Sequence, residues 1–365
     1  MGSNIKLNSK RDSNIELFRI ITMLVIVAHH FVVNSGLFDI LGASGLNAKS
    51  MFAYVFGAWG KTGINCFVLI TGYFMCKSNI TIRKFVKLLA EILFYNIVIG
   101  SIFLLFRYPG YSLLLLLKSL FVVKNVTDGF TSAFLVFYLF IPFLNLLIKN
   151  INQKVHITLL VLCIFIYVIL GSIPKIDVGM NYLSWFIVLY FVSSFIRMYD
   201  FSIFSNKHFW LISSIIMIVL SVLSIVVCLL FTYYFRYVFP YYFLSDSNKI
   251  FAFTLSVCLF MLFKNMNIKY NKVINFIASS TFGVLLIHAN SDIMRQFLWK
   301  DICNVVGSYN SNFFFVYSIL CVVAIFIICI IIDKIRIYCF EKPFFEFWDN
   351  YVAEKLNAIK KKIIK

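Results

Sequence analysis

The sequence SNIELFRIITMLVIVAHHFVV, from Ser13 to Val33, is apolar and long enough to cross a bilayer as a helix, yet it contains Glu16, Arg19, His29 and His30. A helix turns about 100° and rises about 1.5 Å per residue, so the eleven steps from Arg19 to His30 return to within about 20° of one face, roughly 16 Å apart. Glu16 lies one turn before Arg19, where its carboxylate can pair with the guanidinium. His29 points about 100° away from His30. The stretch therefore predicts a spanning helix with an arginine and a histidine in line.

Two interpretations of these polar residues remain open from the stretch alone. Charged side chains inside a spanning helix are costly and usually face a bundle interior or a water-filled cavity, where they serve a function. Alternatively, Glu16 and Arg19 anchor the cytosolic end of the helix, and the histidines lie at the opposite membrane interface.

The composition is that of an integral membrane protein. Of the 365 residues, 62% are hydrophobic and 13% are charged, whereas a soluble domain carries about 25% charged residues. The apolar runs are long and uninterrupted, which predicts an all-α, polytopic membrane helix bundle and excludes the alternating strands of a barrel. The nine cysteines are scattered singly, without a CxxC pair or a cluster at metal spacing, so we expect no disulfide framework and no metal.

Hydropathy places about ten transmembrane helices in the chain. Their expected ranges are 15–36, 57–76, 85–106, 131–148, 156–173, 182–199, 209–233, 247–264, 273–290 and 313–335. The chain is thus divided into a cytosolic N-terminal tail (1–12), a transmembrane domain (13–338) and a basic cytosolic C-terminal tail (339–365). The apolar run from Leu113 to Val123 is too short to cross alone and is expected to be re-entrant or interfacial.

The net charge of +18 first suggests a nucleic-acid partner, but the basic residues are spread over many helix ends. With both termini in the cytosol, 22 of the 33 Lys and Arg fall on the cytosolic side and 10 on the external side. This asymmetry follows the positive-inside rule, so we expect the lipid bilayer as the partner and no nucleic acid. A C-terminal group of lysines is expected to bind anionic lipid: Lys355, Lys360, Lys361, Lys362 and Lys365.

A basic cluster, Arg83, Lys84 and Lys87, lies at the cytosolic start of the third span, in TIRKFVKLLAEILFYN. Positive-inside anchoring explains such a cluster by itself. The cluster also suits a ligand that carries phosphate groups, because ammonium and guanidinium groups donate hydrogen bonds to phosphate oxygens.

In the first membrane helix, ten residues separate Arg19 from His30. This spacing resembles the signature of the membrane-bound acyltransferase 3 family. His29 does not fit that spacing. The sequence GINCFVLITGYFM, Gly63 to Met75, resembles the second helix of the family, with its Gly-rich start followed by Phe, a small residue, Gly and an aromatic residue.

Later stretches extend the resemblance over nearly the whole chain. FLVFYLFIPFLNLL, Phe134 to Leu147, is similar to the central helix of the family. SSTFGVLLIHAN, Ser279 to Asn290, resembles the penultimate helix, which ends in a histidine, here His288. Downstream, Arg295 and Trp299 resemble the pattern of the bacterial surface-polysaccharide O-acyltransferases.

The resemblance implies a multi-pass protein of the bacterial plasma membrane. Its expected reaction moves an acyl group, expected to be acetyl, from cytosolic acetyl-CoA to a hydroxyl of a cell-surface or capsular polysaccharide. Arg83, Lys84 and Lys87 are then the coenzyme A site, with Lys84 and Lys87 at the spacing of a family basic pair. Arg19 positions the acyl donor or the surroundings of His30.

His30 is the implied general base, because the ordinary pKa of histidine lies near neutral pH. A transient acyl-imidazole on the same residue is equally permissible. In the ten-span topology His30 and His288 both lie in the outer half of the membrane, so they are expected to share a cavity. The acceptor side of that cavity is assigned to His288, Arg295 and Glu16, although an isolated histidine at a membrane boundary also fits a purely interfacial role.

A polysaccharide exporter, flippase or polymerase without acyl transfer is the alternative function, because such proteins also have many spans and intramembrane charges. An exporter does not require an in-phase arginine and histidine together with a basic cytosolic mouth. A channel ranks third, since the sequence contains no recognisable filter or ring of charges.

Overall fold

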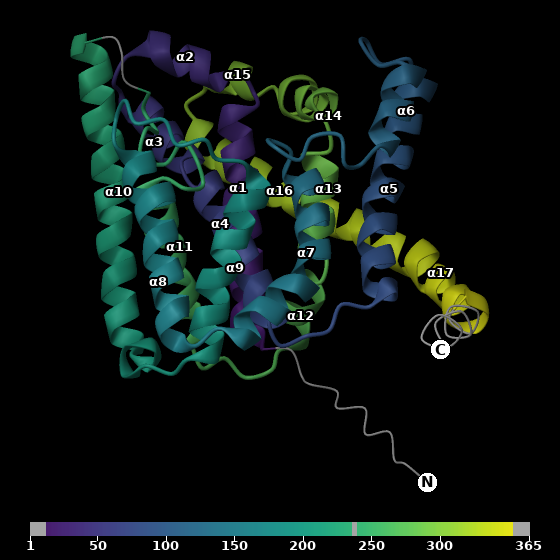
Figure 1. Cartoon of the computed structure of the whole chain (residues 1–365). Helices are drawn as coiled ribbons and strands as arrows, with labels where there is room; N and C mark the ends of the chain where they lie inside the picture. The colour runs from purple at the N-terminus through teal and green to yellow at the C-terminus, as the bar shows by residue number, and fades with distance from the viewer. Residues whose placement is uncertain (1–11, 236–238, 353–365) are drawn as a thin grey trace.

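The computed structural model describes residues 12–235 and 239–352, and within these residues it contains helices and no strand (Figure 1). The predicted all-α membrane helix bundle is confirmed. The longest helices are α1 (Ser13–Val33), α5 (Ile82–Leu105), α7 (Phe130–Asn150), α10 (Lys207–Phe235) and α16 (Phe314–Arg336).

The remaining predicted spans fall on shorter or interrupted helices. These are α4 (Gly60–Met75), α8 (Gln153–Cys163) with the π-helical η1 (Ile164–Leu170), α9 (Tyr182–Met198), α11 (Ile250–Lys264), and α12 (Lys272–Ala278) followed by α13 (Thr281–His288). In the described part of the chain, six helices are long and apolar enough to cross a membrane, or seven if one bent pair counts as a span. The count of ten and the cytosolic position of both termini stay predictions.

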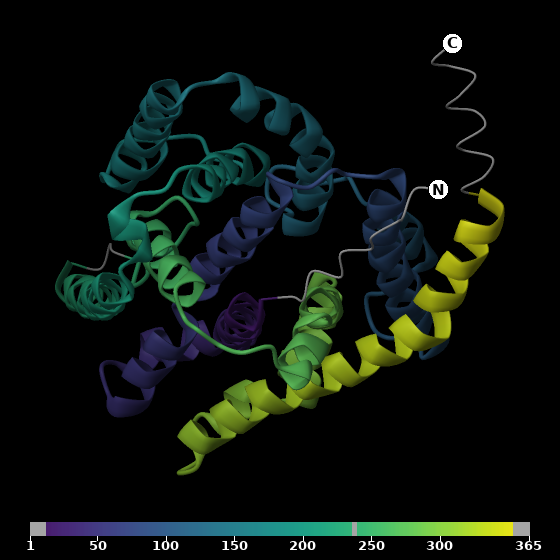
Figure 2. The same cartoon turned by 90° about the horizontal axis from the view of Figure 1, so that it is seen from below.

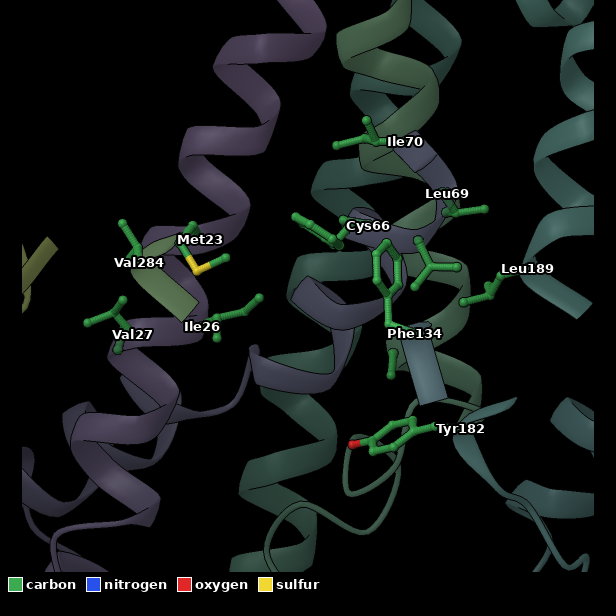
Figure 3. Close-up of a cluster of buried hydrophobic side chains, with 14 of the residues drawn as sticks. Met23, Ile26, Val27, Cys66, Leu69, Ile70, Phe134, Tyr182, Leu189 and Val284 are labelled. Atoms are coloured by element: carbon green, nitrogen blue, oxygen red, sulfur yellow. The ribbon is translucent and has the colours of Figure 1, made fainter. Parts of the chain in front are cut away.

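Helix α1 lies in the middle of the bundle, as the view along its axis in Figure 2 shows. It packs against α3 (Ala48–Gly57), α4, α11, α12, α13 and α16. Phe18, Met23, Val27 and Phe31 of α1 are at most 1% exposed. Figure 3 shows part of this apolar core, where Val284 of α13 lies beside Met23 and Val27. Because neighbours surround α1, its polar side chains are shielded from lipid and can face the protein interior.

Small residues allow α4 to approach α1 closely. A Cβ atom at Gly60 would overlap the His29 ring, and a Cβ at Gly63 would lie 2.7 Å from Cγ1 of Ile26. Membrane helices associate through such glycine contacts because lipid supplies no hydrophobic drive between them. The close contact fixes the position of the histidine pair relative to the start of α4.

The helix that carries His288 is broken. It runs through α12 and α13, and the chain then turns by 96° into α14 (Asp292–Gln296), the π-helical η3 (Phe297–Ile302) and α15 (Val305–Ser308). Asn290 and Ser291 lie at this break. Broken membrane helices are tolerated where protein buries the freed backbone or where the break lines a cavity.

Two further segments border the bundle. The run from Leu113 onward forms α6 (Leu113–Leu120), a short helix beside α5. Helix α16 continues without interruption through η4 (Ile337–Glu341), α17 (Lys342–Phe347) and η5 (Trp348–Val352), and it passes α5 along one side of the molecule (Figure 2). The lysines predicted to bind anionic lipid lie outside the described residues.

Candidate active site

The structure brings His30 and His288, 258 positions apart in the sequence, into direct contact: Nδ1 of His30 lies 2.9 Å from Nε2 of His288. On its other side, Nδ1 of His288 lies 2.6 Å from the carbonyl oxygen of Val284. His288 is fully buried, and the Trp299 ring lies edge-on to it, with the ring centroids 6.4 Å apart. The break after α13 and the last turn of α1 therefore meet at a histidine pair.

The hydrogen-bond partners of His288 determine which ring nitrogens carry a proton when both histidines are neutral. A carbonyl oxygen only accepts, so Nδ1 of His288 carries its proton and donates to Val284. Nε2 of His288 is then unprotonated and accepts a hydrogen bond from Nδ1–H of His30. The remaining nitrogen, Nε2 of His30, is left with a free lone pair. This assignment follows from the hydrogen-bond network.

His30 lines a cavity of about 610 Å³, a volume within the range of small-molecule sites. Its walls come from α1, α4, α5, α6, α7, the start of α9 and the break after α13. Its apolar lining includes Met23, Ile26 and Phe67. A polar part contains the amides and hydroxyls Asn34, Asn96, Asn125, Asn290, Ser119 and Ser291. Apolar walls with a few convergent polar groups are typical of a ligand site.

The two adjacent histidines have different partners. His29 also lines the cavity, but its Nδ1 lies 2.6 Å from the carbonyl oxygen of Gly57 and its ring packs on Gly60. His30 alone contacts His288. The predicted difference in direction between the two rings therefore corresponds to two different sets of contacts.

The acceptor-side residues expected from sequence do not all reach the cavity. Arg295 lines it and forms an ion pair with Asp292. His288 lies behind His30 and is not among the lining residues, because the Val284 carbonyl and His30 occupy its two nitrogens. Glu16 lies at the other end of α1, so it too is removed from the cavity. The structure thus makes His288 a partner of His30 and places Glu16 elsewhere.

A single side chain, that of Phe67, lies between Arg19 and the cavity. Its Nε is 3.4 Å from Oε2 of Glu16, which matches the pairing expected one turn apart. Its guanidinium carbon lies 5.9 Å from the centroid of the Phe67 ring. Phe67 lines the cavity and Arg19 does not. Arg19 therefore approaches the histidine site from the N-terminal side of α1, against the ring of Phe67.

The basic cluster on α5 lies apart from the cavity. Arg83 makes a bidentate ion pair with Asp349, with both distances 2.8 Å, and Lys87 pairs with Glu341. Lys84 donates to Oγ of Ser78 at 2.9 Å and to a neighbouring carbonyl. None of the three lines the cavity, and Lys87 precedes Ile92, the first cavity residue on α5, by five positions, roughly 7–8 Å along a helix. Two of the three cations are thus neutralised by the C-terminal helix.

A buried ion network, which the sequence does not reveal, joins α5 to α16. Arg336 donates to Glu91 at 3.1 Å, to Asp333 at 2.8 Å and to Glu341 at 2.7 Å. Tyr95 donates to Asp333 at 2.7 Å. The only signal in the sequence was the presence of charged residues in apolar helices, and their pairing depends on tertiary structure. The network holds the inner half of α5 against the C-terminal helix.

The site is a histidine pair at a cavity inside an apolar helix bundle, with Arg19 on the N-terminal side of α1. These features define a multi-pass membrane protein with a centre suited to group transfer. Comparison with family models matches residues 12–334 to the acyltransferase domain of the acyltransferase 3 family. The chain belongs to this family and is a multi-pass membrane acyltransferase. No curated protein and no solved structure matches the chain.

Proposed function

We propose that the protein transfers an acetyl group from cytosolic acetyl-CoA to a hydroxyl of a cell-surface or capsular polysaccharide, and that it acts in the bacterial plasma membrane. The observation that carries this proposal is the chain of contacts from Val284 through His288 to His30, which leaves Nε2 of His30 unprotonated at a cavity. A base held in one tautomer is what removal of a proton from a hydroxyl requires.

In the proposed reaction, Nε2 of His30 accepts the proton of the acceptor hydroxyl while the hydroxyl oxygen bonds to the thioester carbonyl carbon. The carbon–sulfur bond then breaks, its electron pair goes to sulfur, and His30 returns the proton to the thiolate. His288 orients the ring and strengthens its hydrogen bond when His30 becomes positively charged. The same Nε2 atom would be the nucleophile if the acyl group passes through an acyl-imidazole.

The polar part of the cavity supports a polyhydroxylated acceptor. Asn290 donates to Oδ1 of Asn96 at 3.0 Å, and Asn96 donates to the carbonyl of Ser119 at 2.8 Å. Asn290 also donates to the carbonyl of Leu286, so Asn96 keeps one N–H donor, and the side-chain oxygens of both residues can still accept from sugar hydroxyls. The hydroxyl-bearing aromatic residues Tyr111 and Tyr182 also line the cavity.

The donor is assigned to the inner end of α5. The phosphates of coenzyme A must compete with Asp349 for Arg83 and with Glu341 for Lys87, because these carboxylates hold both cations. Lys84 has only neutral partners among the described residues. In this proposal, donor binding is therefore coupled to the position of the C-terminal helix, and Lys84 is the most available cation.

The test is acetyl transfer by the purified protein in proteoliposomes, measured as release of coenzyme A thiol and as O-acetylation of the host glycan by proton NMR. We expect wild-type protein to consume acetyl-CoA and His30→Ala to lose that activity. Glycan export or elongation without thioester consumption would instead identify an exporter or a polymerase.

A further inference from the structure

Lys61 is a charged side chain in the cavity wall that the mechanism above does not use. It lies near the start of α4, and its Nζ donates to the hydroxyl of Tyr182 at 2.9 Å and to Oδ1 of Asp246 at 3.1 Å. Lys61 and Tyr182 line the same cavity as His30. A lysine inside a membrane protein is costly and is kept where it is paired and faces a polar cavity.

The partner Asp246 belongs to an irregular segment, 239–249, that the bundle holds in place. Nδ2 of Asn65 donates to the carbonyl of Ser247 at 2.7 Å, and the buried Trp185 donates to Oδ1 of Asn65 at 2.8 Å. Irregular backbone persists inside a membrane protein when protein buries it or when it borders a cavity. Asp246 is therefore held by a packed segment.

An ammonium group has three N–H donors. Among the described residues, Tyr182 and Asp246 take two of those of Lys61, which leaves the third for a ligand in the cavity. Lys61 directly follows Gly60, where an added Cβ atom would overlap the ring of His29. A fixed cationic donor thus shares the cavity with the base.

We propose that Lys61 is a catalytic residue that donates a hydrogen bond to the carbonyl oxygen of the acyl group as that oxygen becomes negatively charged. The inference rests on the proposed acyl transfer at His30. When the acceptor oxygen bonds to the carbonyl carbon and its proton passes to His30, the π electron pair of the carbonyl moves onto oxygen. The oxyanion accepts from Lys61, which keeps all its protons.

Collapse of this intermediate restores the carbonyl and breaks the carbon–sulfur bond. The electron pair of that bond goes to sulfur, which takes the proton from His30, so coenzyme A leaves as the thiol. A donor that is fixed before the reaction and aimed at developing charge lowers the barrier because it needs no reorganisation.

The pairing with Asp246 favours this role over binding of an anionic acceptor. The carboxylate offsets the charge of Lys61, so the site suits a neutral carbonyl that becomes charged only in the transition state. A ligand with a permanent negative charge would gain less from Lys61, because Asp246 already pairs with that charge. Recognition of such a ligand would raise the KM for the acceptor, whereas oxyanion stabilisation acts on kcat.

Lys249 provides a matched control on the same segment. Its Nζ donates to the carbonyl of Gly171 at 2.5 Å and lies 4.9 Å from the ring centroid of Tyr242, outside the cavity. Lys61 and Lys249 each tie the segment 239–249 to a neighbouring helix. A loss caused by loosening of that segment should therefore appear in both Lys→Met variants.

The experiment uses the full-length protein in membrane vesicles of a host strain that lacks its own copy, with radiolabelled acetyl-CoA as donor and the host glycan as acceptor. We expect Lys61→Met to lower kcat by about 10²–10³-fold, the loss typical of one oxyanion donor, with the KM for acetyl-CoA little changed. Lys61→Arg should retain part of the rate because it keeps a cationic donor. Lys249→Met should retain the rate, and both methionine variants are compared by thermal unfolding in detergent.

Equal loss in Lys61→Met and Lys249→Met would make Lys61 a structural tie, and a raised acceptor KM with normal kcat would make it an anion-binding residue. Either result overturns the proposal, as does full activity of Lys61→Met. A wild-type protein that consumes no thioester would refute acyl transfer itself and this inference with it. An active wild type with an active Lys61→Met refutes only the role of Lys61.

Discussion

The histidine pair and the basic cluster on α5 are two polar regions of one membrane bundle with opposite arrangements of partners. His30 is held by neutral groups, the ring of His288 and behind it a carbonyl, so it keeps a free lone pair at the cavity. Arg83 and Lys87 are held by carboxylates of the C-terminal helix, so their charge is already offset. His30 is therefore ready to react, whereas Arg83 and Lys87 must each exchange a carboxylate before they can bind a phosphate.

The largest expected effect separates the two adjacent histidines of α1. His30→Ala removes the proton acceptor and should lower kcat by about 10²–10⁴-fold, the usual contribution of a general base. His29→Ala removes a ring that contacts the Gly57 carbonyl and not His288, and it should cost much less. The measurement is O-acetylation of the host glycan at matched membrane abundance. Equal losses, or normal activity of His30→Ala, would contradict the assignment.

The next effect concerns His288, which acts through His30. His288→Phe keeps a buried aromatic ring but removes the acceptor for Nδ1–H of His30, so the tautomer and the orientation of His30 are no longer fixed. We expect kcat to fall roughly 10–100-fold, as for other partners that orient a functional imidazole, with the KM for acetyl-CoA unchanged. A structural role alone would instead appear as lower thermal stability with normal kcat in the surviving protein. The pH profile of kcat provides a further readout, because its shape should change only if His288 is coupled to His30.

The two regions also differ in how far sequence predicted them. The in-line spacing of Arg19 and His30 follows from helix geometry, and the apolar runs predict the spanning helices, because both depend only on neighbours along the chain. The contact between His30 and His288 depends on the broken helix after α13, and hydropathy cannot place such a break. Lys61 lies near the start of the expected span 57–76, and a positive residue there has the same appearance in sequence whether it faces a cavity or solvent.

The sequence also could not predict which charged residues pair across the fold. Asp349 and Glu341 lie in a stretch assigned to a cytosolic tail, and nothing in their spacing connects them with α5. The structure continues α16 as one helical stretch to Val352, which brings both carboxylates to the basic cluster. The family match ends at residue 334, before both of them.

A smaller effect tests the donor site. Lys84→Gln removes a cation with only neutral partners among the described residues and should weaken acetyl-CoA binding by one charge-assisted contact, about 1.5–3 kcal/mol, seen as a higher KM. Lys87→Gln should raise the KM less, because Glu341 already holds this cation in the wild type. Lys77→Gln, an exposed lysine just before α5, is the control. An unchanged KM in the Lys84 and Lys87 double variant would leave both lysines as topology anchors only.

The smallest expected effect is a decrease in the KM for acetyl-CoA, whereas the other variants are expected to lose activity or donor affinity. Arg83 and Asp349 are both about half exposed, so water and salt screen their ion pair and keep it weak. If coenzyme A phosphates compete with Asp349 for Arg83, then Asp349→Asn removes the competitor and should lower the KM for acetyl-CoA by about fivefold at most. Glu346→Gln removes an exposed carboxylate from the same helix and should leave the KM unchanged. A higher KM in Asp349→Asn would show that Asp349 organises Arg83 for the donor, and it would reverse the view that the C-terminal helix shields this site.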